Sequence, residues 1–131
     1  MTIHLKVTIR KLLGRVSNFM NTHVPRVEAC ASFCTVATEI SDKHLGMTMV
    51  YDQLPDGECI GIITDGDVRR AIQRYNDVQI TAQQVMTPSY KYIHQDALLS
   101  DALAIMDKHN ITTLAVTETP EEKKIVGIIS I

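Results

Sequence analysis

The chain has 131 residues, enough for one globular domain with a substantial hydrophobic core. Its hydrophobic content of 45%, charged content of 21% and net charge of −2 are ordinary for a globular protein and give no reason to expect nucleic acid or an anionic membrane as a partner. No apolar run approaches the roughly 18 residues of a membrane span. Charges interrupt Met1–Leu13, unlike a signal peptide, so we expect a cytoplasmic protein.

The pattern of apolar residues in residues 1–20 predicts a connector rather than a separate domain. Their apolar residues first alternate as in a short strand and then recur at helical spacing. The alternating positions are Ile3, Leu5, Val7 and Ile9, and the helically spaced ones are Leu12, Leu13, Val16, Phe19 and Met20. A leader of this kind indicates a link to something upstream.

From Val24 onward the chain repeats itself. Residues 42–50 align with residues 107–115 at an offset of 65, with an identical Asp-Lys-His, and residues 60–64 align with residues 126–130 at an offset of 66. Upstream, the same pairing places apolar residues on one helix face in each half. These residues are Phe33, Ala37 and Ile40 in the first half and Leu98, Ala102 and Ile105 in the second. We interpret the halves as two copies of one supersecondary unit.

Each copy is expected to run from an extended piece through an amphipathic helix to two strands joined by a turn. The strands are predicted at residues 47–51 and 59–63 in the first copy and at residues 113–117 and 125–129 in the second. The first copy adds a helix over residues 68–75. The second reaches Ile131 where its own turn and helix would begin, which suggests a piece of something longer. The expected fold class is α/β (α+β), with two β-α-β-β-α units.

The three cysteines, Cys30, Cys34 and Cys59, form no C-x-x-C pair. An odd number of cysteines fits reduced thiols in a cytoplasm better than a disulfide framework. A zinc site on Cys30 and Cys34 would need further ligands at suitable spacing, and none are nearby, so no metal site is expected.

The stretch from Gly61 to Ile72 marks the change from a buried strand to a helix. A hydroxyl, two carboxylates and a glycine follow the apolar run, and Thr64 or Asp65 could cap the helix. The free N–H groups at a helix start form a mild anion site, and Asp67 could chelate a ribose diol. The alternative is a plain helix cap without a ligand.

The repeat as a whole, with each copy containing G-h-h-[ST] at the end of its last strand, resembles a tandem cystathionine-β-synthase (CBS) domain pair. The resemblance covers residues 20–131 and is complete in the first copy, where Asp67 supplies the acidic position. It implies two units, residues 21–80 and 81–131, packed sheet to sheet about a pseudo-twofold axis. It also implies that adenosine nucleotides or related ligands bind in the clefts between the copies.

Three stretches are also similar to the bacterial arabinose-5-phosphate isomerases. They are Arg10–Val16 and the Thr-Asp-Gly-Asp-Val-Arg-Arg of residues 64–70, together with Val85–Pro88. Those enzymes interconvert ribulose 5-phosphate and arabinose 5-phosphate for 3-deoxy-manno-octulosonate and lipopolysaccharide synthesis. The resemblance implies that residues 1–20 connect to an upstream sugar-isomerase domain, that this chain alone is not an enzyme, and that it forms a homodimer or tetramer.

The ligand sites follow from the CBS resemblance and from the repeat. Thr64 and Asp67 match the motif's hydroxyl and acidic positions, and the repeat would bring residues of the other copy opposite them. The first site is expected to comprise Gly61, Ile62, Thr64, Asp67, Arg69, Arg70, Tyr92, Ile93, Thr112 and Thr113. A weaker second site would use Val27, Met47, Thr48 and Ser130. Arg69 and Arg70 could bind phosphate, or could simply be solvated.

The expected role is regulatory. The ligand would be AMP, ATP or a cytidine sugar nucleotide, the last from pathway logic alone, and no cofactor is required. No Ser/His/Asp arrangement or P-loop appears, and His44 with His109 at matching helix ends fits capping better than catalysis. The alternative is a purely architectural module that holds subunits together with its clefts empty.

Overall fold

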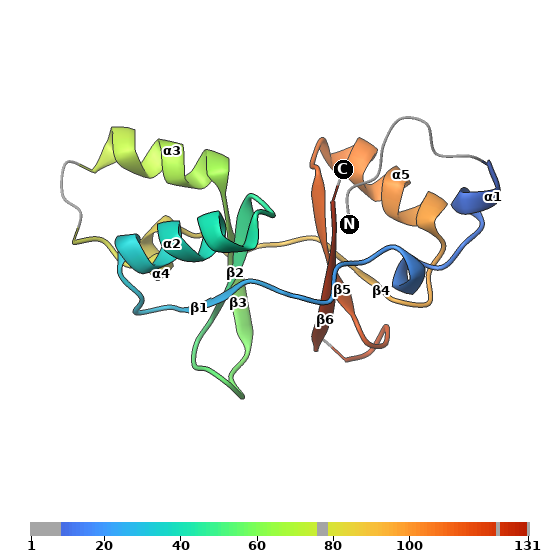
Figure 1. Ribbon diagram of the computed structural model, residues 1–131, viewed down its shortest axis with the longest axis horizontal. Helices are drawn as coiled ribbons and strands as arrows, with labels where there is room; N and C mark the ends of the chain where they lie inside the picture. The colour runs from blue at the N-terminus through green and yellow to red at the C-terminus, as the bar shows by residue number, and fades with distance from the viewer. Residues whose placement is uncertain (1–8, 76–78, 123, 131) are drawn as a thin grey trace. The chain divides into compact units, whose positions relative to one another are not determined.

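The computed structural model describes residues 9–75, 79–122 and 124–130. These residues form two compact units. The first-sheet unit comprises residues 25–75 and 79–90, and the second-sheet unit comprises residues 9–24, 91–122 and 124–130. Each unit has its own three-stranded sheet and its own hydrophobic core (Figure 1). The two sheets and their helices confirm the predicted mixed α and β fold class.

The first-sheet unit contains strands β1 (Arg26–Glu28), β2 (Met47–Tyr51) and β3 (Cys59–Thr64), paired in that order. The β1–β2 pair is parallel and the β2–β3 pair is antiparallel. The parallel pair requires a crossover, which helix α2 (Phe33–Lys43) provides. Helix α3 (Asp65–Arg74) follows β3 directly, and both helices cover the same face of the sheet (Figure 1). Helix α4 (Ala82–Val85) completes the unit.

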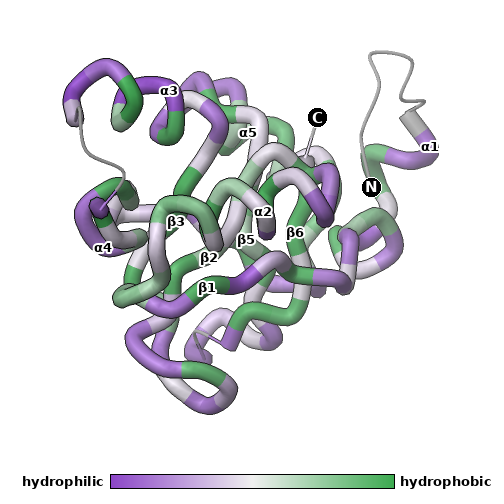
Figure 2. The backbone as a smooth tube through the Cα atoms, turned by 60° about the vertical axis from the view of Figure 1, so that its left-hand side comes forward, coloured by the Kyte–Doolittle hydropathy of each residue, from purple (hydrophilic) through white to green (hydrophobic). Residues whose placement is uncertain are grey.

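The second-sheet unit repeats this arrangement with strands β4 (Tyr92–His94), β5 (Thr113–Thr117) and β6 (Ile125–Ser130). Its crossover helix is α5 (Leu99–His109). Helix α1 (Ile9–Leu12) and a 3-10 helix at Val16–Asn18 belong to the same unit. Hydropathy colouring shows an apolar β6 and a largely hydrophilic α3 (Figure 2), as expected for a strand in a core and a helix on a surface. Of the helices that the structure describes, none is long and apolar enough to cross a membrane.

The strand predictions are confirmed, since β2 and β5 have the predicted bounds and β3 and β6 are each one residue longer. Helix α3 begins at Asp65 rather than at the predicted Val68, because Thr64 caps it. The predicted helix faces were less accurate. Val36 and Ile40 are the buried residues of α2, whereas Ala37 is exposed; in α5, Leu99, Ala102 and Met106 are buried.

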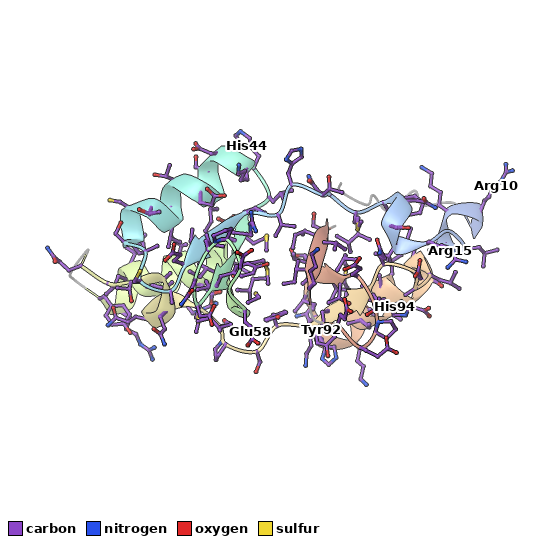
Figure 3. The ribbon with its side chains drawn as sticks, turned by 90° about the horizontal axis from the view of Figure 1, so that it is seen from below. Arg10, Arg15, His44, Glu58, Tyr92 and His94 are labelled. Atoms are coloured by element: carbon purple, nitrogen blue, oxygen red, sulfur yellow. The ribbon has the colours of Figure 1, made fainter. Side chains whose placement is uncertain are left out.

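The repeat has one register throughout the described elements. Corresponding strands and crossover helices all begin 66 residues apart. The offset of 65 inferred from the shared Asp-Lys-His is therefore wrong for the helix ends. His44 and Asn110, each with a left-handed φ of 58° and 53°, terminate α2 and α5, so His44 corresponds to Asn110 and not to His109. Asn tolerates this conformation well, which makes it a common helix terminator. His44 occupies the corresponding position at the C-terminal end of α2 (Figure 3).

Each unit includes the segment that precedes the other unit's sheet in the sequence: residues 9–24 belong with β4–β6, and residues 81–90 belong with β1–β3. Asn21 pairs with Ile128 of β6 by two backbone hydrogen bonds of 2.7 and 2.9 Å, and Thr87 pairs with Ile62 of β3 by bonds of 2.8 and 3.0 Å. Val16 is fully buried in the second core. Residues 9–24 are thus part of the second-sheet unit rather than a connector alone. The division differs from the expected boundaries, because residues 81–90 pack with the first sheet. Residues 1–8 of the predicted connector lie outside the described residues.

Two glycines permit this exchange. A Cβ added to Gly61 would lie 2.6 Å from Met86 Sδ and 2.8 Å from the Thr87 carbonyl oxygen. A Cβ added to Gly127 would lie 2.6 Å from Met20 Sδ and 3.1 Å from the Asn21 carbonyl oxygen. Each sheet therefore uses a glycine where a methionine and a backbone segment approach its last strand.

Candidate functional site

The junction of β3 and α3 holds the residues that the sequence singled out. Thr64 is the N-cap, and its Oγ1 accepts a hydrogen bond of 3.3 Å from the Asp67 N–H. The Asp67 carboxylate accepts a hydrogen bond of 2.9 Å from the Thr64 N–H in return. This reciprocal capping box satisfies two donors at the helix start and fixes the carboxylate against the first turn. The cap is Thr64 rather than Asp65.

The Asp67 carboxylate is buried, with 7% of the residue exposed, and it accepts four hydrogen bonds. Oδ2 accepts from the backbone N–H and the hydroxyl of Thr64, at 2.9 and 3.2 Å. Oδ1 accepts from Arg70 Nη2 at 2.7 Å and from Thr87 Oγ1 at 3.1 Å. The interactions compensate for removing the charge from water. Sequence reasoning missed Thr87, because a contact 20 residues away leaves no local pattern.

The two arginines have different environments. Arg70 pairs with Asp67 while 69% of its side chain remains exposed. Its guanidinium lies over the first turn of α3, with Nη1 3.3 Å from the point where a Cβ on Gly66 would be. Arg69 is exposed and forms no ion pair among the described residues. The predicted phosphate-binding cations are therefore one arginine held at the helix start and one solvated arginine.

Gly61 and Ile62 contact residues 86 and 87 of the same unit. Gly61 is buried beneath Met86, and the backbone of Ile62 pairs with Thr87. The close approach that Gly61 allows is thus made by residues 86 and 87. Within the first-sheet unit, the structure brings Thr64, Asp67 and Arg70 together, with Thr87 as an addition.

The remaining expected residues of the first site belong to the second-sheet unit. Tyr92 is 44% exposed, Thr112 is exposed and Thr113 is half-buried at the start of β5. Ile93 is 6% exposed and packs in the core of its own unit, which leaves little of its side chain for a ligand. Their place beside Thr64 and Asp67 stays a prediction.

The residues of the expected second site are all buried. Val27 lies in the first core, Met47 and Thr48 are 1% and 0% exposed on β2, and Ser130 is 8% exposed at the end of β6. The Thr48 hydroxyl donates to the Met49 carbonyl at 3.3 Å. These residues stay a weaker prediction.

Nothing in the described residues suggests nucleophilic or metal chemistry. Burial raises the pKa of the Cys59 thiol, which also donates to the Gly61 carbonyl oxygen at 3.5 Å. Burial, with a smaller effect of Cys59, raises the pKa of Tyr51 to about 12. Both groups therefore stay protonated at neutral pH. No group of three or more metal-binding side chains occurs among the residues that the structure describes.

A hollow of about 460 Å³ lies between α2 and the start of α3 in the first-sheet unit. Apolar residues of the two helices and polar groups line it. They are Ala37, Ile40, Ser41, His44, Gly46, Asp65 and Val68. Thr64 and Asp67 are not among the lining residues, so this hollow is separate from the capping-box carboxylate.

Known proteins resemble this chain in sequence and in fold. A family model of the CBS domain matches residues 82–131. The arabinose 5-phosphate isomerase KpsF of Escherichia coli is 38% identical over 123 residues, which are 93% of this chain and 36% of that protein. The chain thus spans about a third of the length of this relative. A comparable 38% identity extends to the isomerase KdsD of Pseudomonas aeruginosa, over 86% of this chain and 35% of that protein.

Solved structures agree at the level of the fold. A CBS domain protein from Pyrobaculum aerophilum complexed with AMP has a TM-score of 0.78 at 20% identity, covering 88% of this chain and 86% of that one. A CBS domain pair in complex with 5′-methylthioadenosine and S-adenosyl-L-methionine has the same TM-score and identity, covering 90% of each chain. Residues 82–131 thus match the CBS domain family, the chain has the fold of solved CBS domain pairs, and its sequence is similar to one region of the arabinose 5-phosphate isomerases.

Proposed function

We propose that this CBS pair is a regulatory module that binds a nucleoside phosphate at the start of α3. The observation that carries the proposal is the buried Asp67 carboxylate, which the capping box with Thr64 holds at a helix N-terminus. A carboxylate can accept both hydroxyls of a ribose, and the helix start favours an adjacent phosphate. Two CBS proteins of the same fold are complexed with adenosine compounds.

In this proposal the ligand is AMP, ATP or a cytidine sugar nucleotide. Asp67 binds the ribose, Thr64 holds the Asp67 carboxylate in place, and Arg70 balances the phosphate charge, while Arg69 stays solvated. Tyr92, Ile93, Thr112 and Thr113 would complete this first site. The arrangement needs no metal and no cofactor.

The similarity to arabinose 5-phosphate isomerases supports a sugar-isomerase domain as the partner that this module would regulate. Because the chain covers 36% of KpsF, we propose that a sugar-isomerase domain precedes this region in the whole protein. That whole protein would supply arabinose 5-phosphate for lipopolysaccharide synthesis. A ligand can change the activity of such a domain only if it binds two states of the protein with different affinities. Residues 16–21 pack in the second-sheet unit and lie where such a change could pass upstream.

Calorimetric titration tests the binding proposal. Wild-type protein is titrated with AMP, ATP and a cytidine sugar nucleotide, alongside Asp67→Asn and the matched control Asp65→Asn. Asp67→Asn removes the charge that the diol and its donors use, and we expect a loss of affinity of about tenfold or more. Asp65 is exposed in the same turn, so its substitution should change affinity less than about threefold. Absence of binding by all three ligands to the wild type would refute the proposal.

A second candidate is an architectural role in subunit association. The observation that favours it is Ile72, which is 62% exposed on α3. Burial of this side chain between two copies would add apolar contact to a subunit interface. Sedimentation of Ile72→Ser against wild type tests it: a dimer that survives dilution in the wild type and dissociates in the variant supports this role, and the two roles can coexist.

A further inference from the structure

The four hydrogen bonds to Asp67 divide into an inner and an outer pair. Among the residues that the structure describes, the inner oxygen Oδ2 accepts hydrogen bonds from Thr64 alone, within the capping box. The outer oxygen Oδ1 is bound by Arg70 and Thr87, at 2.7 and 3.1 Å. A ribose diol that binds Asp67 must therefore replace protein donors, because both oxygens are already in use.

The outer pair is the one that can exchange. The inner bonds include a backbone donor and hold the first turn of α3, so breaking them would also break the helix cap. Arg70 has 69% of its side chain in solvent, where water readily replaces an ion pair. The hydroxyl of Thr87 can also move without opening its segment, since two backbone bonds to Ile62 hold Thr87 in place.

The geometry also shows where Arg70 would go. Its Nη1 and Nη2 lie 3.3 and 3.5 Å from the position of a Cβ on Gly66, so the guanidinium already covers the helix start that favours an anion. Guanidinium binds phosphate in a bidentate manner, whereas it has no comparable interaction with a neutral nucleoside. A short rotation would exchange the Asp67 carboxylate for a ligand phosphate.

We propose that Arg70 is an exchangeable latch on Asp67 that selects phosphorylated nucleosides over neutral ones. The inference rests on the proposed nucleoside phosphate binding and assigns the discrimination to one residue. A neutral nucleoside must displace Arg70 from Oδ1 and offers it nothing in return. A nucleoside phosphate displaces Arg70 and then binds it through the phosphate.

The test compares adenosine with AMP in wild type, Arg70→Gln and the matched control Arg69→Gln. Both substitutions remove one positive charge from the same exposed helical turn, but only Arg70 touches Asp67. In Arg70→Gln we expect adenosine to bind roughly threefold to tenfold more tightly and AMP to bind no more tightly than in wild type, so the preference for AMP falls by at least about threefold. In Arg69→Gln the preference should stay within about twofold.

A further variant separates the latch from simple charge. Thr87→Val removes the second donor to Oδ1 without changing charge, and should raise the affinity for adenosine and AMP by similar factors. An unchanged AMP preference in Arg70→Gln, or an equal fall in Arg69→Gln, would overturn the latch while leaving nucleotide binding intact. If neither ligand binds any of the four proteins at millimolar concentration, the proposed function fails and the latch fails with it.

Discussion

Truncation of Val16 tests the finding that residues 9–24 are an integral part of the second-sheet unit. Val16 is fully buried among residues of β4, α5, β5 and β6. Substitution by alanine removes two methyl groups from this core and leaves a small cavity. Between the values typical of smaller and larger core truncations, we expect a loss of about 2 kcal/mol in the free energy of unfolding.

The assay is urea unfolding followed by circular dichroism. With a urea dependence of about 2 kcal/mol/M, typical of a small domain, the midpoint should fall by about 1 M and the slope should not change. The matched control is Leu13→Ala, since Leu13 lies three residues earlier and is 68% exposed; its midpoint should shift by less than about 0.3 M. Equal, small shifts in both variants would refute the packing and leave the segment as a connector only.

Three other predictions concern the first-sheet unit. Gly61→Ala places a Cβ 2.8 Å from the backbone oxygen of Thr87, so we expect a loss of about 1–3 kcal/mol in the free energy of unfolding; an unchanged urea midpoint would contradict this close approach. Burial raises the pKa of Cys59, while Cys30 and Cys34 are exposed; iodoacetamide at pH 8 should therefore modify two thiols rapidly and Cys59 slowly, and mass spectrometry would detect the reverse order. The raised pKa of Tyr51, about 12 against 10.0 when unfolded, means that its contribution to stability is complete below about pH 10 and is lost as pH rises to about 12. Tyr51→Phe should remove this part of the alkaline destabilisation, and an identical pH profile in the variant would count against it.

Strands were predictable because their apolar runs are short, bounded by turn residues and repeated. The bounds of β2 and β5 came directly from these runs. The helix register was not predictable in the same way. The shared Asp-Lys-His suggested one alignment, whereas the left-handed helix ends at His44 and Asn110 fix another, and backbone conformation rather than residue identity decides equivalence. Asn110 was the signal in the sequence that favoured the correct register.

The candidate site was partly predictable. Thr64 and Asp67 were found because a capping box has a fixed local spacing. Thr87 was missed, and so was the exchange of residues 15–21 and 81–87 between the units, because both depend on contacts between distant segments. Gly61 and Gly127 carried a hint of that exchange: each lies inside a strand, where a glycine often marks the close approach of another segment.

The most direct test of ligand binding at the start of α3 is an amide NMR titration of the chain with AMP. We predict saturable shifts concentrated at Thr64, Gly66 and Asp67, and their loss in Asp67→Asn with the capping residues still folded. Shifts confined to other parts of the chain, or the same shifts in Asp67→Asn, would contradict a nucleotide site built on this carboxylate.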